Sequence, residues 1–208
     1  MPAARPAPAS RPSLSERRKA QTRFEIARTA ARLFAAEGTA TVTAERIAAE
    51  SGVGLRTFYR YCRTKEDAVE PLLSTGASRW LDSLADGPAR LPTPAEFAAA
   101  AARALTPRDD GTEMDVMRGL LRAMEQDPAL RAVWHRVNLT GEQSLLTVLT
   151  GLSPETDTLR LRLTAVAAAG AIRVALEQWA TGDAPATGPG SPADLVTDCM
   201  HKLTAGLG

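Results

Sequence analysis

Residues 55–61 carry two arginines, two tyrosines and a threonine, and they follow a glycine-containing turn at 51–54. An arginine can donate paired hydrogen bonds to a guanine edge, a threonine can contact a thymine methyl group, and a tyrosine hydroxyl can reach a phosphate. At helical spacing Phe58 faces inward with Cys62 and Val53, which leaves the polar side chains outside. This segment could therefore read base pairs, and the side chains expected to contact DNA are Arg56, Thr57, Tyr59, Arg60 and Tyr61.

Two predicted helices precede this segment and would hold it in place. A capping box, Ser13-x-x-Glu16, starts a helix over 14–37 that ends at Gly38, and Thr43 can cap a short helix over 44–50. A helix, a short helix, a glycine turn and a second short helix form the helix-turn-helix arrangement, whose last helix enters the major groove. We therefore expect a three-helix DNA-binding domain.

The distribution of charge agrees with a polyanionic partner for this part of the chain. Residues 1–65 hold 13 Lys or Arg against 5 Asp or Glu, a net charge of +8, whereas residues 66–208 hold 12 against 19, a net charge of −7. Basic side chains early in the first helix could follow a phosphate strand or the minor groove, although a solvated basic arm explains them equally well. The residues concerned are Arg17, Arg18, Lys19 and Arg23.

Residues 24–69 resemble the DNA-binding domain of TetR-family transcriptional regulators. The resemblance lies in an A-x-x-L-F-x-x-x-G block from Ala30, T-x-x-x-I-A from Thr43, G-V at Gly52, T-F-Y-x-Y from Thr57 and K-E-D from Lys65. No comparable motif is present in the remaining 140 or so residues, where only helix number and length agree with the family.

The resemblance implies roles for individual residues. Thr43 and Lys65 match positions that face phosphates, whereas Tyr59 and Tyr61 match positions that touch the DNA backbone. The variable positions that read bases are occupied by Arg56, Thr57 and Arg60. Three residues depart from the usual pattern: Gly54 replaces a frequent serine, Leu55 a polar residue and Cys62 a phenylalanine.

The rest of the chain also predicts helices, and no segment has the alternation of a strand. Start signals such as Thr93-Pro94 and Asp127-Pro128 recur, because proline in the first turn loses no hydrogen bond. We predict an all-α fold of about nine helices: an N-terminal three-helix helix-turn-helix domain and a helical C-terminal ligand-binding and dimerisation domain. The remaining six helices are expected at 65–86, 94–105, 113–126, 128–150, 155–181 and 192–206.

The expected organisation is a disordered basic tail at 1–12, the DNA-binding domain at 13–65 and a regulatory and dimerisation domain at 66–208. Pro71 falls about seven residues into the fourth helix, where it would kink that helix and fix the angle between the domains. The alternative is that the helix ends at Glu70.

Two sets of residues in the C-terminal part have candidate roles. The large side chains of the middle helices could line an adaptable ligand pocket or form ordinary core; they are Trp80, Phe97, Met117, Leu121, Met124, Trp134 and Asn138. Apolar stripes on the last two helices predict a four-helix dimer interface, made by Leu163, Val166, Gly170, Val174, Leu195, Cys199 and Leu203.

Other classes of protein are disfavoured. The sequence has no stretch long enough to span a bilayer, no secretory signal, no phosphate loop or hydrolase motif, and too few cysteines and histidines for a zinc site. We therefore expect a cytoplasmic homodimer that is not an enzyme and needs no cofactor or metal. It would bind a palindromic double-stranded DNA operator, most simply as a repressor that an unknown small molecule releases. An effector-independent regulator controlled by concentration or a protein partner is the alternative, and activation instead of repression stays open.

Overall fold

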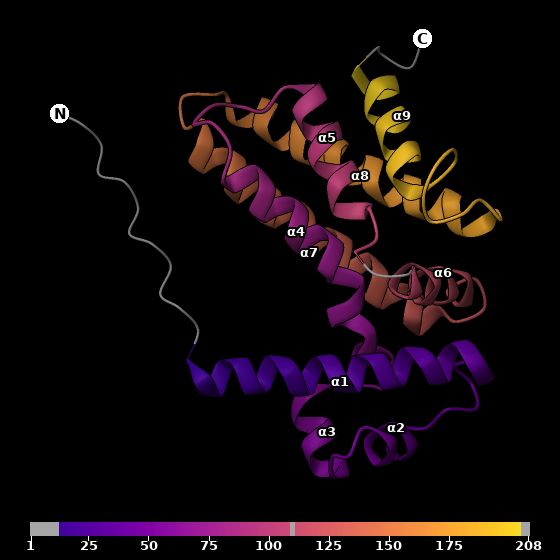
Figure 1. Cartoon of the computed structure of the whole chain (residues 1–208). Helices are drawn as coiled ribbons and strands as arrows, with labels where there is room; N and C mark the ends of the chain where they lie inside the picture. The colour runs from indigo at the N-terminus through magenta and orange to yellow at the C-terminus, as the bar shows by residue number, and fades with distance from the viewer. Residues whose placement is uncertain (1–12, 109–110, 205–208) are drawn as a thin grey trace.

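The structure is a computed structural model that describes residues 13–108 and 111–204, so the tail predicted at 1–12 lies outside the described residues. Over that part of the chain the fold is all-α, with no strand. In Figure 1, α1 lies below the larger helical body, with α2 and α3 packed on its far side. The helices are α1 Leu14–Glu37, α2 Ala44–Glu50, α3 Leu55–Tyr61, α4 Glu70–Ala85, α5 Pro94–Leu105, α6 Thr112–Ala123, α7 Pro128–Leu152, α8 Thr158–Thr181 and α9 Pro192–Thr204, with a 3-10 helix at Glu66–Val69.

The local start and stop signals form as expected in most of these helices. Ser13 and Glu16 make the reciprocal capping box of α1, and Thr93 and Glu96 make that of α5. The side chain of Asp127 accepts hydrogen bonds from two backbone amides at the start of α7. The predicted start of α8, at residue 155, is wrong by three residues, because Asp157 caps the helix. Asp157 accepts from the amide three residues on, which is the geometry of an N-cap.

The helix predicted at 65–86 is divided, and this changes the role of Pro71. Thr64 accepts a hydrogen bond from the Asp67 amide, but residues 66–69 form a 3-10 turn and the α-helix begins only at Glu70. Pro71 consequently lies in the first turn of α4, where its missing N–H has no partner to lose. The prediction that Pro71 kinks the interior of a long α-helix is therefore wrong.

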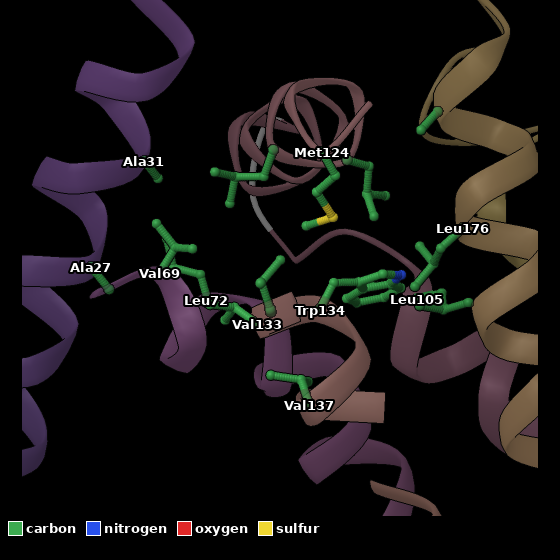
Figure 2. Packing of buried hydrophobic residues seen from close by; sticks show 14 of the residues in the cluster. Ala27, Ala31, Val69, Leu72, Leu105, Met124, Val133, Trp134, Val137 and Leu176 are labelled. Atoms are coloured by element: carbon green, nitrogen blue, oxygen red, sulfur yellow. The ribbon is translucent and has the colours of Figure 1, made fainter. Parts of the chain in front are cut away.

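One hydrophobic core runs from the first helices into the larger helical body. Figure 2 shows Ala27 and Ala31 of α1 beside Val69 and Leu72, with Trp134 and Leu176 further along the same cluster. The elements that pack against α1 from the larger part are the 3-10 turn, α4 and α6. A rearrangement in the larger part can therefore reach α1 through packed side chains.

Candidate nucleic-acid interface and ligand cavities

Helix α3 presents two arginines and a tyrosine to solvent because one aromatic side chain fixes its inner face. Phe58 is completely buried, and Cys62 is buried beside the end of the helix. Arg56, Tyr59 and Arg60 are exposed, and the Tyr59 ring is 51% accessible while it packs edge-on against Phe58, with centroids 5.4 Å apart. This is the geometry that a helix needs to place its side chains in a DNA groove.

The other two predicted contacts of α3 are less accessible. Thr57 and Tyr61 are half-buried, and Tyr61 packs against the hydrophobic core. The guanidinium of Arg60 lies 5.2 Å from the centroid of the Tyr61 ring. Tyr61 therefore does not lie wholly on the outward surface, as helical spacing alone had suggested. Arg60, whose guanidinium lies over the Tyr61 ring, is at the exposed edge of the helix.

The turn between α2 and α3 depends on one glycine conformation. Gly52 has φ +70°, in the left-handed region that a residue with a Cβ adopts only at a cost. The amide of Val53 then donates to the carbonyl of Ala48, which closes the turn at 3.0 Å. Gly54 is the N-cap of α3 and offers no side-chain acceptor there. The turn sets the angle between the two short helices.

Thr43 and Lys65 hold the loop that leads into α2. The Thr43 hydroxyl accepts from the Arg46 amide at 3.3 Å, which confirms its role as an N-cap. The Lys65 ammonium donates to the carbonyls of Thr39 at 2.5 Å and Val42 at 2.8 Å, and lies 3.7 Å from a Glu66 oxygen. Lys65 is thus directed at the protein's own loop, and these two carbonyls use two of the three N–H donors of its ammonium.

The basic residues of α1 lie where the sequence placed them, near its start. Arg17, Arg18 and Arg23 are exposed.

The Cys62 thiol has a raised pKa. The positive charge of Arg23 lowers this pKa, but burial dominates and raises it to about 11. The thiol therefore stays protonated, and Cys62 serves as a small core residue.

Four of the seven residues proposed for a ligand pocket line one inner cavity, and three do not. Trp80, Met117, Trp134 and Asn138 share its wall. Phe97, Leu121 and Met124 are buried core residues that do not line this cavity, and Phe97 instead packs against Trp80. The cavity holds only about 60 Å³, whereas pockets for drug-sized ligands have roughly 300–1,000 Å³. Most of this set is packed core.

A larger cavity that the sequence reasoning missed lies between α1, α4 and α6. Its volume is about 730 Å³, and its wall combines apolar side chains with Arg28, Arg32, Arg79 and Arg108. Arg28 and Arg32 are one helical turn apart on α1, a spacing that could have indicated a shared cationic face. The partners from α4 and α6 are far away in sequence.

The residues proposed for the dimer interface differ between the last two helices. Leu163, Val166 and Val174 of α8 are 61%, 50% and 46% exposed, and Gly170 lies half-buried among them. On α9, Leu195 and Cys199 are half-buried within the chain and Leu203 is exposed. The apolar stripe of α8 is thus open in the single chain, and that of α9 is only partly so.

Two further features bear on the class of protein. No helix of the described part of the chain is long and apolar enough to cross a membrane. Among the residues described, no group of three or more His, Cys, Asp or Glu side chains is arranged to hold a metal ion.

A helix-turn-helix with an exposed arginine-bearing helix, joined to a larger bundle of helices, defines the class of helix-turn-helix regulatory proteins. Residues 26–70 match the family model for bacterial regulatory proteins of the tetR family. The HTH-type transcriptional regulator TcmR of Streptomyces glaucescens is 31% identical over 130 residues, which are 60% of this chain and 57% of TcmR. The match thus spans little more than half the length of that relative.

Solved structures agree in fold over most of the chain. A crystal structure from Mesorhizobium loti, described as a TetR-family regulator, has a TM-score of 0.53 at 17% identity and covers 90% of this chain and 97% of its own. The multidrug binding protein EbrR, solved with imidazole, has a TM-score of 0.52 at 20% identity, with 96% and 97% covered. Residues 26–70 are thus similar to the tetR family of bacterial regulatory proteins, and the fold of the chain is similar to that of these solved structures.

Proposed function

We propose that the protein is a sequence-specific DNA-binding regulator of transcription that binds a palindromic operator as a homodimer. The observation that carries this proposal is α3, where buried Phe58 holds Arg56, Tyr59 and Arg60 toward solvent. In this proposal Arg56, Thr57 and Arg60 read bases, and Thr43, Tyr59, Tyr61 and Lys65 meet the backbone. Arg17, Arg18 and Arg23 would add phosphate contacts at the start of α1. Such a protein acts where the chromosome lies, in the bacterial cytoplasm, and needs no enzymatic activity.

A dimer is proposed because α3, the helix that would contact bases, is short. A helix of seven residues reads few bases, whereas two such helices about 34 Å apart read two half-sites on one side of the duplex. The exposed leucine and valines of α8 supply an apolar surface that a second copy can cover.

The regulatory mode proposed is repression relieved by a small molecule. A ligand that prefers one arrangement of the helices shifts the protein toward it in proportion to its difference in affinity for the two states. The small volume of the inner cavity favours a second candidate, a regulator without an effector. Thermal unfolding in the presence of a panel of metabolites separates the two, because a ligand that binds only the folded state raises the unfolding temperature.

The direct test is footprinting of the purified protein on the promoter next to its own gene. We expect protection of a palindrome with half-sites one helical turn apart, and a steep loss of binding as salt rises, because phosphate contacts release counterions. Equal affinity for the promoter and for random DNA would overturn the proposed sequence specificity.

A further inference from the structure

The cavity between α1, α4 and α6 has the size and the lining of a site for an organic molecule. About 730 Å³ falls inside the range of drug-sized pockets, and it is about twelve times the volume of the inner cavity. Its apolar wall includes Phe24 of α1, Leu72 of α4, and Val116 and Leu120 of α6. These side chains can enclose the hydrocarbon part of a ligand.

The charge of the lining selects an acidic ligand. Among the described residues that line the cavity, four are arginines and only Glu113 is acidic. Glu113 pairs with Arg79 at 3.3 Å, and Glu50, outside the lining, pairs with Arg32 at 2.5 Å. Arg28 instead stacks on the Phe24 ring, with its guanidinium carbon 5.4 Å from the ring centroid. The lining therefore carries net positive charge after both ion pairs are counted.

One buried donor in this wall has no partner. The Nε atom of Arg79 is inaccessible to solvent and makes no hydrogen bond within the described part of the chain, although the side chain is paired through its terminal nitrogen. Buried donors are usually satisfied, because an unpaired donor loses the hydrogen bonds that it made to water. An acceptor oxygen in the cavity would satisfy this Nε–H and gain a charge-assisted hydrogen bond.

The two cavities have a common wall, made by Leu72, Arg79, Glu113 and Met117. Methionine has three rotatable bonds and adapts to irregular space, so Met117 can move aside for a chain that extends inward. The inner cavity beyond it is lined by Trp80 and Trp134. A ligand with its acidic group at Arg28 and Arg79 can thus lengthen its apolar part toward these aromatic rings.

We propose that the junction cavity binds a small organic acid with an apolar body, whose acidic group is held by Arg28 of α1 and Arg79 of α4. The inference rests on the proposed function in one respect: the bound acid is taken as the effector. Since α1 belongs to the DNA-binding part and α4 and α6 to the larger bundle, one ligand contacts both. It would favour one relative arrangement of the two parts.

The test uses the full chain and two fluorescent probes that differ in one acidic group. Anilinonaphthalene sulfonate carries a sulfonate on an apolar body, and N-phenylnaphthylamine has the same rings without it. We expect the wild-type protein to bind the sulfonate more tightly than the neutral probe. In the double variant R28Q/R79Q the affinity for the sulfonate should fall about tenfold, which corresponds to about 1.4 kcal/mol.

Three controls keep the result specific. R28K/R79K retains the charges and should recover part of the sulfonate affinity. R103Q removes an exposed arginine of α5 outside this cavity and should change nothing. T75W places a large ring on the cavity wall and should weaken both probes. Thermal unfolding of each variant shows that it is folded.

Equal sulfonate affinity in the wild type and a folded R28Q/R79Q would overturn the site, as would unchanged binding of both probes to T75W. The promoter footprint reports separately on the proposed function. A protein that protects its promoter but binds the sulfonate without arginine dependence retains the proposed function and loses this inference. A protein that binds the sulfonate through the two arginines but ignores DNA retains the site and loses the proposed function.

Discussion

The helix-turn-helix and the larger helical body are both built from α-helices, but they expose different kinds of side chain. The first keeps a short, charged helix on the surface, with Phe58 buried beneath it and Tyr59 accessible above. The second leaves an apolar stripe exposed on α8 and encloses cavities between helices. The difference teaches that a reading surface can be specified by neighbours in sequence, whereas a ligand site needs helices that meet only in the folded chain.

The two regions are nevertheless connected through a small set of polar contacts. Arg136 of α7 pairs with Asp67 and Glu70, at the turn that follows the helix-turn-helix. Burial of the Asp127 carboxyl opposes ionisation, but hydrogen bonds from Thr39 and from two backbone amides outweigh it and lower its pKa. Asp127 therefore links the start of α7 to the loop before α2. Together with the shared core, these contacts join α7 to the 3-10 turn and to the loop before α2.

The largest expected effect concerns Phe58, which is buried beneath the exposed face of α3. Phe58→Ala should destabilise the protein by about 3–5 kcal/mol, because the ring is fully buried and its removal leaves a cavity. Chemical denaturation followed by circular dichroism measures this. Tyr59→Ala, at the exposed neighbour, is the matched control and should cost much less. Similar losses for both variants would contradict the assignment of inner and outer faces.

The second prediction concerns the apolar stripe of α8. Leu163→Glu should break the proposed dimer at a cost of several kcal/mol, because a charge would be buried against its own copy. Light scattering after size exclusion measures the mass. Leu139→Glu is the control, since Leu139 is 54% exposed but lies on α7. If the Leu163→Glu protein keeps the mass of a dimer, the interface lies elsewhere.

The third prediction has a smaller expected effect, and it separates a base contact by Arg56 from a backbone contact by Lys65. Arg56→Ala should lose roughly 1–3 kcal/mol of operator binding and relax the preference at one base pair. Lys65→Ala should instead weaken operator and random DNA by similar factors if its ammonium reaches a phosphate. Competition binding against operators with single base changes distinguishes the two. A uniform loss for Arg56→Ala would make Arg56 a phosphate contact.

The smallest expected effect concerns the capping box at the start of α5, in the larger helical body. Arg90 donates two hydrogen bonds to Glu96, at 2.6 and 2.8 Å, and with the Thr93 amide these hold the pKa of Glu96 at about 2. Because the folded pKa lies below the ordinary 4.5, the stabilisation is complete above that value and is lost as the pH falls toward 2.

Thermal unfolding at about pH 6 and about pH 3 should therefore show a smaller difference in Glu96→Gln than in the wild type. Asp82→Asn, at an exposed position outside this capping box, is the control and should retain the pH dependence of the wild type. An unchanged pH dependence in Glu96→Gln would show that the capping box of α5 adds nothing measurable.

Where the sequence was informative, the signal was local. The capping boxes at Ser13 and Thr93 and the burial of Phe58 and Cys62 follow from spacing within a few residues, and the structure confirms them. The prediction of a kink at Pro71 was wrong because residues 66–69 form a 3-10 turn and α4 begins only at Glu70. The packing of Val69 against α1 in the shared core could not be predicted from the sequence. The loop carbonyls that Lys65 binds were not predictable, because they belong to residues 23–26 positions earlier in the chain.

The amino-acid order alone determined most of the helices, the position of the glycine turn and the chemical character of α3, because these depend on interactions between near neighbours. Only the tertiary structure decided where the cavities lie. The large one is walled by α1, α4 and α6, and no periodicity in one segment reports which distant arginines will converge. Cavities are what remains between packed helices, so their volume and charge are set by the packing itself.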